Sequence, residues 1–197
     1  MSTIEDLKAI VSRKGGLARP NQFLVELPPD FFDTRVSNIL CTNVQLPGKQ
    51  ILTHDRRINM EFEKVAYGYG VGDVNMTFLA TNDHEVKKFF DRWKSSILDE
   101  ESLTVGYKAD YQRPVKIHHL KKPIFGIQGR IGPVSISLNL GADSIYSLEL
   151  KNAFPTTLGQ IDLTNELDGI VQYNVQLSYT NWRRIDGIRQ IGLNLSI

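Results

Sequence analysis

The chain has 197 residues, of which 41% are hydrophobic and 23% are charged, a composition typical of a globular protein. Its 23 Lys and Arg residues nearly balance its 22 Asp and Glu residues, so bulk attraction to nucleic acid or to anionic membranes is not expected. The single cysteine, Cys41, excludes an internal disulfide. The first residues do not read as a signal peptide and no run of about 18 uncharged apolar residues occurs, so we expect a soluble, cytosolic chain without membrane insertion.

Residues 1–16 predict a short helical arm. Ser2 and Glu5 have the spacing of a capping box, and Gly15 and Gly16 end the helix. The apolar stripe of this helix consists of Ile4, Leu7, Ile10 and Val11. Because so short a helix needs a surface to lie on, two alternatives stay open: it docks on its own domain, or it reaches a neighbouring subunit.

From residue 20 the hydrophobic period changes to two, which predicts β-strands. Candidate strands lie at residues 23–27, 36–44, 60–65 and 74–80. The polar segment 47–57 is too long for a tight hairpin, and we interpret it as a loop.

A strong amphipathic helix is expected over residues 83–98. Asn82 is a natural N-cap, and Glu85 follows it three residues later. The apolar residues at helical spacing on one face are Val86, Phe89, Phe90, Trp93 and Ile97. We expect this aromatic face to pack on a sheet as core, rather than to bind a cofactor.

Strand patterns return at residues 115–119, 134–138, 145–151 and 170–179, and turn signals at 139–144 fit a hairpin connection. About eight strands and one main helix predict a mainly β (α+β) fold. Its expected architecture is an antiparallel β-sandwich or barrel with one flanking α-helix.

The sequence contains no constellation for catalysis or metal binding. His118 and His119 are the closest pair of histidines, but adjacent residues of a strand point to opposite faces. The glycines of residues 68–72 have strand patterns on both sides, whereas a phosphate-binding loop opens a helix. Cys41 lies in a strand-like run, where an inert buried thiol is typical. We therefore expect no enzyme activity, no cofactor and no metal.

Charge is segregated along the chain. Residues 111–142 contain five basic residues and no acid, and residues 152–182 contain three acids and no basic residue. Ordinary solvated surface is one interpretation, and complementary patches at a head-to-tail interface between subunits are the other. The candidate contacts between subunits or rings, which also include part of segment 47–57, are Pro47, Gly48, Lys49, Arg56, Arg57, Lys121, Lys122, Arg130, Asp162, Glu166 and Asp168.

Seven motifs occur in an order and at spacings that point to one family. They are residues 18–26 (ARPNQFLVE), 46–48 (LPG), 56–59 (RRIN), 81–83 (TND) before the helix with Phe89 and Trp93, 109–111 (ADY), an expected turn at 154–159 (FPTTLG), and the pattern running from Ile170 through Tyr173 and Tyr179 to Trp182. Over about residues 17–182 the chain resembles the tail tube proteins of contractile-tailed bacteriophages. Baseplate tube proteins and the tube protein of type VI secretion systems are related to that family.

The resemblance implies a structural virion protein. Its subunits, β-sandwich-like with one flanking helix, would join as hexameric rings whose strands form one barrel, and stacked rings would form the channel for DNA ejection inside a contractile sheath. The implied partners are other copies of the chain, the sheath and baseplate proteins, the tail terminator, and genomic DNA that passes without specific binding. Assembly would take place in the cytoplasm of the host bacterium.

Two regions depart from compact members of the family. Residues 121–145 read as an enlarged hairpin, and residues 183–197 extend past the last shared strand. These additions leave open whether the chain is the repeating tube subunit, a baseplate-proximal tube initiator, or the tube protein of a related contractile injection system. A monomeric β-barrel that binds nucleic acid is a further alternative, and it predicts salt-dependent affinity for DNA.

A channel that lets DNA pass should carry few cations on its wall, because each Lys or Arg attracts phosphate through counterion release. We therefore expect Arg56, Arg57, Lys121, Lys122 and Arg130 to avoid the lumen and to serve subunit or ring contacts. Segment 47–57 is our candidate for a loop between rings.

Overall fold

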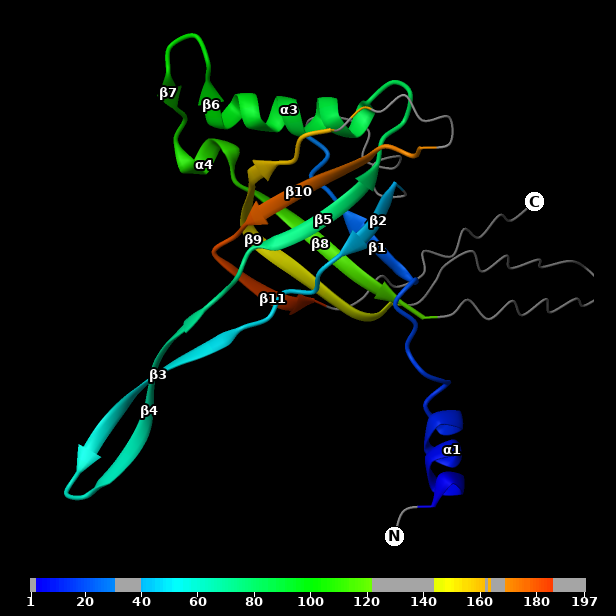
Figure 1. The fold of residues 1–197 in the computed structure, drawn as a ribbon, viewed down its shortest axis with the longest axis vertical. Helices are drawn as coiled ribbons and strands as arrows, with labels where there is room; N and C mark the ends of the chain where they lie inside the picture. The colour runs from blue at the N-terminus through cyan, green and yellow to red at the C-terminus, as the bar shows by residue number, and fades with distance from the viewer. Residues whose placement is uncertain (1–2, 31–39, 122–143, 162, 164–168, 186–197) are drawn as a thin grey trace, which may run out of the picture. The chain divides into compact units, whose positions relative to one another are not determined.

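The computed structural model describes residues 3–30, 40–121, 144–161, 163 and 169–185 (Figure 1). The chain divides into two compact units, which are described separately. The larger unit consists of residues 24–117 and 148–185, and the smaller one contains the described residues 3–23, 118–121 and 144–147.

In the smaller unit, helix α1 (Ile4–Arg13) begins with a capping box made by Thr3 and Asp6, one residue later than the predicted pair Ser2 and Glu5. The Thr3 amide donates to the Asp6 carboxylate at 3.0 Å, and the Asp6 amide donates to the Thr3 hydroxyl at 3.4 Å. Gly15 and Gly16, at φ 79° and 99°, end the helix as expected, since positive φ favours glycine. No side chain of α1 is buried.

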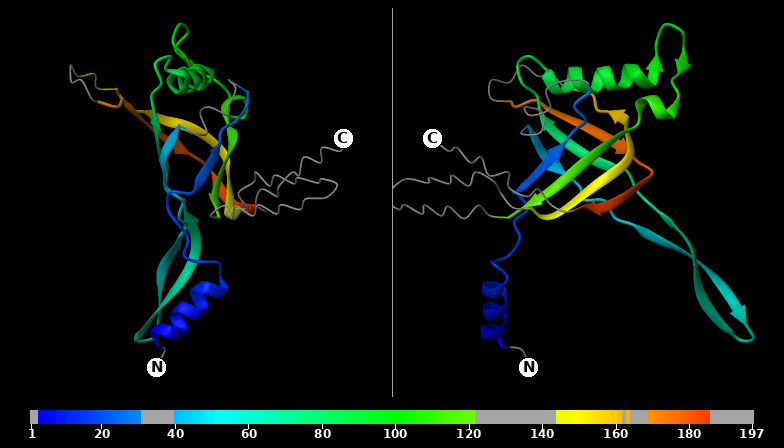
Figure 2. Two further views of the ribbon diagram at one scale, coloured as in Figure 1. Left: turned by 90° about the vertical axis from the view of Figure 1, so that its right-hand side faces the viewer. Right: turned by 180° about the vertical axis from the view of Figure 1, so that it is seen from behind.

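A seven-stranded sheet contains the core, with strand order β1-β8-β9-β10-β5-β2 and β11 paired with β9. The strands are β1 (Phe23–Glu26), β2 (Cys41–Val44), β5 (Val74–Leu79), β8 (Arg113–Leu120), β9 (Ser144–Leu158), β10 (Gln172–Ser178) and β11 (Asn181–Ile185). Figure 2 shows β2, β5 and β10 in one layer and β1 and β8 in the other, with β9 bending between them. The pairs β10–β5, β10–β9 and β2–β5 are antiparallel. The expected mainly β, antiparallel architecture is confirmed.

Side chains from both layers fill the space between them. Val25 of β1 and Val115 of β8 are fully buried, as are Phe78 of β5 and Leu177 of β10. Outward-pointing residues alternate with these, so the strands carry the period of two that the sequence predicts.

Helix α3 (Glu85–Ile97) lies at one end of the two layers (Figures 1 and 2). Phe90 contacts Phe78 and Tyr173, with ring centroids 5.5 and 6.2 Å apart. The fully buried Trp93 donates from its indole nitrogen to the Tyr111 carbonyl of α4 (Lys108–Tyr111) at 2.8 Å. The expected core face is therefore correct, with Ile97 half-buried at its end.

The start of α3 differs from the prediction. Its N-cap is His84, in the left-handed region at φ 51°, rather than Asn82. The Thr81 hydroxyl donates to the carboxylate of Asp83, and this bond holds residues 81–83 in a turn ahead of the helix. A short ladder of β6 (Leu98–Asp99) and β7 (Thr104–Val105) follows the helix.

The expected turn at residues 154–159 is wrong, because residues 154–158 belong to β9. Pro155 lies opposite Leu177, next to a register shift in the pairing of β9 with β10. A proline is tolerated at such an irregularity, because one ladder hydrogen bond is already missing there. Gly159 alone lies beyond the strand.

The expected loop at residues 47–57 is also wrong. Most of it is strand β3 (Gln50–Ile58), which pairs with β4 (Glu61–Gly70) in a separate two-stranded sheet. The strands are joined by a tight turn at Asn59 and Met60, with Asn59 at φ 57°. Polar residues occupy both faces of the ladder, so the sequence lacks the alternation that marks a half-buried strand.

Several sequence predictions lie outside the described residues. They concern the strand pattern at 134–138, residues 36–39 of the pattern at 36–44, residues 139–143 of the hairpin connection, and nearly all of the enlarged hairpin at 121–145. Of the extension at 183–197, residues 183–185 belong to β11, and the remainder is likewise not described.

Candidate assembly surface

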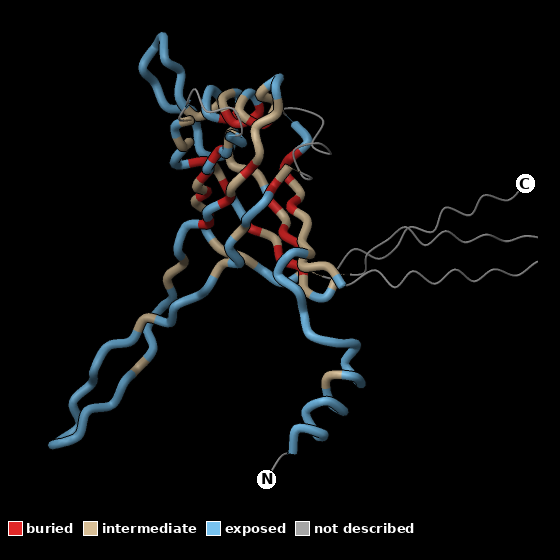
Figure 3. The backbone as a smooth tube through the Cα atoms, turned by 45° about the vertical axis from the view of Figure 1, so that its right-hand side comes forward, coloured by how far each residue is buried: buried red, intermediate tan, exposed pale blue. Residues whose placement is uncertain are grey.

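The hairpin formed by β3 and β4, called here the β3–β4 hairpin, exposes large apolar side chains. Figure 3 shows it exposed along most of its length, and no residue of either strand is buried. Met60 at the turn is 91% exposed and Phe62 is 72% exposed. The other exposed large hydrophobic residues of the hairpin are Ile51, Ile58, Tyr67 and Tyr69. An isolated two-stranded hairpin is marginally stable in water, so an apolar surface of this kind indicates a partner.

The cross-strand register places charged residues of the hairpin opposite residues of the other charge. Asp55 lies opposite Lys64, and Arg56 lies opposite Glu63. Opposite charges at such positions favour the ladder by roughly 0.2–1 kcal/mol. Arg57 donates from Nε to the Asn59 carbonyl at 2.9 Å and so braces the turn. Arg57 therefore has a local structural role, and the expected contact of Arg56 and Arg57 with another ring stays a prediction.

The base of the hairpin is held by Lys49, which lies between two aromatic rings. Its ammonium nitrogen is 4.8 Å from the centroid of the Tyr69 ring and 5.1 Å from the centroid of the Trp182 ring. Trp182 of β11 also donates from its indole nitrogen to the Gly48 carbonyl at 3.3 Å. Cation–π contacts at exposed sites contribute roughly 0.5–1 kcal/mol each. We call Gly48, Lys49, Tyr69 and Trp182 the base clamp.

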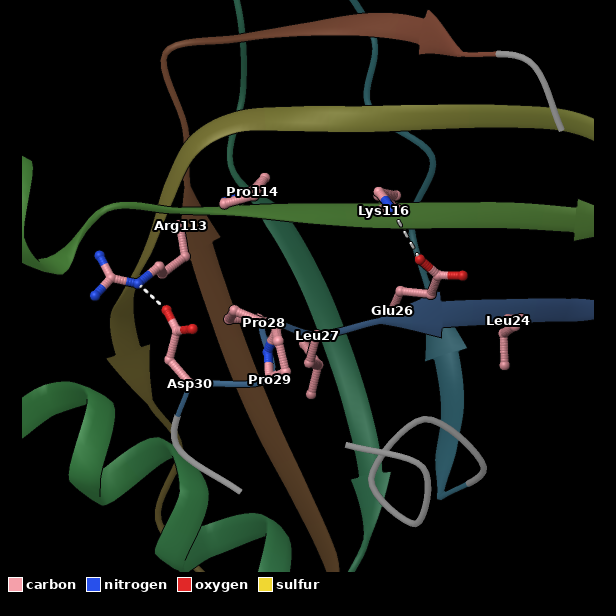
Figure 4. A pocket seen from close by; sticks show the side chains of 9 residues that line it. All are labelled: Leu24, Glu26, Leu27, Pro28, Pro29, Asp30, Arg113, Pro114 and Lys116. Carbon is pink, nitrogen blue, oxygen red and sulfur yellow. Dashed lines mark hydrogen bonds and ion pairs between the residues drawn. The ribbon is translucent and has the colours of Figure 1, made fainter. Parts of the chain in front are cut away.

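A groove of about 470 Å³ lies on the outer side of the β1–β8 layer (Figure 4). Arg113 pairs with Asp30, and Lys116 pairs with Glu26 at 3.2 Å. Both pairs are partly exposed to solvent, where an ion pair contributes about 1 kcal/mol or less. Because its charges are paired with one another, the groove lacks the convergent acid and base groups of an active site.

The histidines and the cysteine have structural environments. The Nδ1 atom of buried His118 lies 2.8 Å from the Ser147 hydroxyl, and His119 Nε2 lies 2.9 Å from the Arg19 carbonyl oxygen. Burial raises the pKa of the Cys41 thiol to about 12. Among the described residues, no three His, Cys, Asp or Glu side chains form a group that could hold a metal ion. The same part of the chain contains no helix that is both long and apolar enough to cross a membrane.

The structure brings some of the expected contact residues together and leaves others apart. Pro47 lies beside the base clamp, which includes Gly48 and Lys49, whereas Arg56 and Arg57 lie near the hairpin turn. Of the expected contact residues Lys121, Lys122 and Arg130, the structure describes Lys121, whose Cε atom lies 3.7 Å from the position that a Cβ would take at Gly15. Outside the described residues are Lys122, Arg130, Asp162, Glu166 and Asp168.

Sequence reasoning missed the apolar members of this surface. The alternation of Met60 and Phe62 signals a strand but gives no indication that the side chains are exposed. Trp182 joins the base clamp from β11, which is far from Lys49 in the sequence, and no local pattern connects the two.

Solved structures with the same fold come from contractile injection systems. A chain in the cryo-EM structure of the sheath–tube complex of the extracellular contractile injection system PVC, in the extended state, has a TM-score of 0.59 at 12% identity, covering 94% of this chain and 99% of that one. A chain in the baseplate structure of the anti-feeding prophage has a TM-score of 0.56 at 18% identity, covering 86% and 96%. A chain in the structure of the cap that terminates the tube of that prophage has a TM-score of 0.59 at 11% identity, covering 86% and 91%. At these identities the likeness establishes the fold alone.

A search of the curated proteins found no significant match. A family model described as phage tail tube protein matches residues 17–185, which includes the whole span of the sequence resemblance noted above. The chain therefore belongs to the phage tail tube protein family and is a structural subunit of a tail tube.

Proposed function

We propose that the protein is the repeating subunit of a tail tube, assembling as hexameric rings that stack around a channel for DNA. Family membership and the fold shared with a chain of a sheath–tube complex support this assignment. The observation that carries it is the β3–β4 hairpin, whose large apolar side chains stay exposed within the described part of the chain. A neighbouring copy that packs on the hairpin would bury them.

The sheet also offers surfaces for assembly. Strands β1 and β2 are its edges in the order of the described strands. An edge strand presents unpaired backbone donors and acceptors, and pairing it with the edge of another copy removes this liability. Joining six sheets in this way gives a closed barrel.

The sheath, the baseplate and a terminator are the further partners that we propose. Chains with this fold occur in a sheath–tube complex, in a baseplate and in a tube-terminating cap. The fold therefore suits both ends of a tube as well as its length, and a baseplate-proximal tube initiator is the second candidate for this chain. The length of the tubes that the purified chain forms distinguishes the two candidates. A repeating subunit forms long tubes by itself, whereas an initiator stops after few rings.

Electron microscopy of the purified full chain tests the assignment. We expect rings and tubes of uniform diameter for the wild-type protein. The variant Phe62→Ser should remain monomeric, because fully burying a phenylalanine contributes roughly 1.5–3 kcal/mol at each contact and a ring repeats the loss. Its circular dichroism and its free energy of unfolding should stay close to those of wild-type monomers, since Phe62 is exposed within the subunit.

Leu103→Ser is a matched control, because Leu103 is an exposed apolar residue outside the hairpin. Tubes are expected to form normally in this variant. A wild-type chain that stays monomeric at high concentration, or one that binds DNA with strong salt dependence, would contradict the assignment and favour the nucleic-acid-binding barrel.

A further inference from the structure

The two layers of the sheet differ in the charge of their outward faces. The outer side of the β1–β8 layer carries Glu26, Arg113 and Lys116 (Figure 4). In contrast, strands β2, β5 and β10 and residues 154–158 of β9 contain no charged residue. The whole chain is 23% charged, and the surfaces of soluble domains are typically about 25–35% charged. A continuous outward face without charge is therefore a specific feature of one layer.

Amide and hydroxyl side chains make up most of this face. The register between β5 and β10 sets Thr77 opposite Asn174 and Asn75 opposite Gln176, while the residues between them point into the core. Thr157 lies opposite Gln176 on the other side. We define the uncharged face as Thr42, Asn43, Asn75, Thr77, Thr156, Thr157, Gln172, Asn174, Gln176 and Ser178.

Side chains of the uncharged face hydrogen-bond to one another and to the strand ends. The Thr77 hydroxyl donates to the side-chain oxygen Oδ1 of Asn174 at 2.9 Å, and the side-chain amide of Asn75 donates to Oε1 of Gln45 at 3.3 Å. The Gln176 amide donates to Asp73 at 2.8 Å, just outside the face. Groups bonded in this way offer a passing molecule fewer free donors and acceptors.

Gly159 keeps the face open next to Asn174. Its amide donates to the Asn174 carbonyl at 2.7 Å, and a Cβ at residue 159 would lie 2.8 Å from the same oxygen. A shallow groove of about 260 Å³ runs here between β5, β10 and the end of β9. Backbone packing as close as this requires glycine.

We infer that the uncharged face lines the channel of the tube and lets a charged polymer pass without binding it. The inference rests on the proposed function, because a channel exists only in the assembled tube. A face without Lys or Arg displaces no counterions from DNA, and a face without carboxylates does not repel it. The carboxylate of Asp73, which accepts from Gln176, lies at the edge of this face. Ring symmetry copies each side chain around the wall, so a single cation per subunit becomes a ring of cations. The charged β1–β8 layer faces away from the channel.

Cysteine labelling of assembled tubes tests which layer lines the channel. The native Cys41 gives little background, since its thiol is buried and its pKa is raised to about 12. Asn174→Cys probes the uncharged face, with Thr157→Cys as a second position should the first variant fold poorly. Lys116→Cys probes the opposite layer. Each tube is treated with N-ethylmaleimide and with a maleimide coupled to a globular protein too wide for the channel.

In tubes, Asn174→Cys and Thr157→Cys should react with N-ethylmaleimide and should react at least tenfold more slowly with the bulky reagent than in dissociated subunits. Lys116→Cys should react with both reagents. If the bulky maleimide labels residue 174 in tubes as fast as in dissociated subunits, the inference is overturned. Protection of residue 174 from both reagents would also overturn it, because that result indicates a buried interface. If the wild-type chain forms no tubes, the proposed function fails and this inference fails with it.

Charge introduced at the same position gives an independent readout. Wild-type tubes should retain no short double-stranded DNA at 50 mM salt, whereas Asn174→Lys tubes should retain it and release it as salt rises. Ser95→Lys, on the exposed side of α3, is the matched control and should behave like the wild type. Retention by wild-type tubes, or equal retention by both lysine variants, would contradict a non-binding wall at residue 174.

Discussion

The β3–β4 hairpin and the β5–β10 pair are both antiparallel ladders, but their side chains have opposite fates. In β5 and β10 every second residue is buried, with Phe78 and Leu177 fully so. In β3 and β4 no residue is buried, although Ile51, Phe62 and Tyr69 are as apolar. One ladder is stabilised by the core of its own subunit, and the other exposes apolar side chains that we propose to contact a second copy. Exposure, rather than strand pairing, therefore distinguishes the ladder in the core from the ladder that we propose for assembly.

The largest effect is expected from a change in the core. Trp93→Ala should lower the free energy of unfolding by about 3–5 kcal/mol, because it leaves a cavity under α3 and removes the hydrogen bond to Tyr111. Urea unfolding of the monomeric protein followed by circular dichroism measures the change. The hairpin variant Phe62→Ser should change the free energy of unfolding by about 0.5 kcal/mol or less. Similar losses in both variants would show that the hairpin is part of the subunit core.

The base clamp connects the two regions, and its removal should have an intermediate effect. Trp182→Ala removes one cation–π contact and the bond to Gly48, and should cost about 1 kcal/mol. Amide exchange should accelerate at residues 48–50 and 69–72, while β5 and β10 stay protected.

Lys49→Met and Trp182→Phe serve as matched variants of the clamp. The first keeps an apolar stem and removes the charge, and the second keeps a ring and removes the indole donor. Each variant should reproduce part of the faster amide exchange that we expect for Trp182→Ala. Unchanged exchange in Trp182→Ala would mean that the clamp does not hold the base of the hairpin.

The smallest effect is expected from the charges of the hairpin. Arg56→Glu places two carboxylates opposite each other and should destabilise the ladder by roughly 0.2–1 kcal/mol, measured as faster amide exchange in β3 and β4. Adding Glu63→Arg restores a pair of opposite charges and should return the amide exchange rate to that of the wild type. Any shortening of tubes in the Arg56→Glu variant should also be reversed. A shortening of tubes that the second change does not reverse would assign Arg56 to a contact with another ring.

Local patterns predict the elements that pack on the core, and also helix α1 and part of β4, in which no side chain is buried. The spacing of Val86, Phe89, Phe90 and Trp93 identified α3 and its buried face, and alternation identified β5 and β10. The start of α3 was misplaced by two residues, because Asn82 and Asp83 are good caps in isolation but the turn at Thr81 places His84 at that position. Propensity for a cap is a local preference that a neighbouring hydrogen bond overrides.

Composition and order of residues by themselves determined the fold class, the family resemblance and the neutral character of β2, β5 and β10, since these depend on residue type and short-range period. Only the tertiary structure decided that residues 50–58 form one side of a ladder, that Trp182 meets Lys49, and that the uncharged residues share one outward face. The physical reason is that periodicity records which side chains of an element share one face, and not what that face packs against. Contacts between distant residues, and surfaces kept for another copy, leave no such record in the sequence.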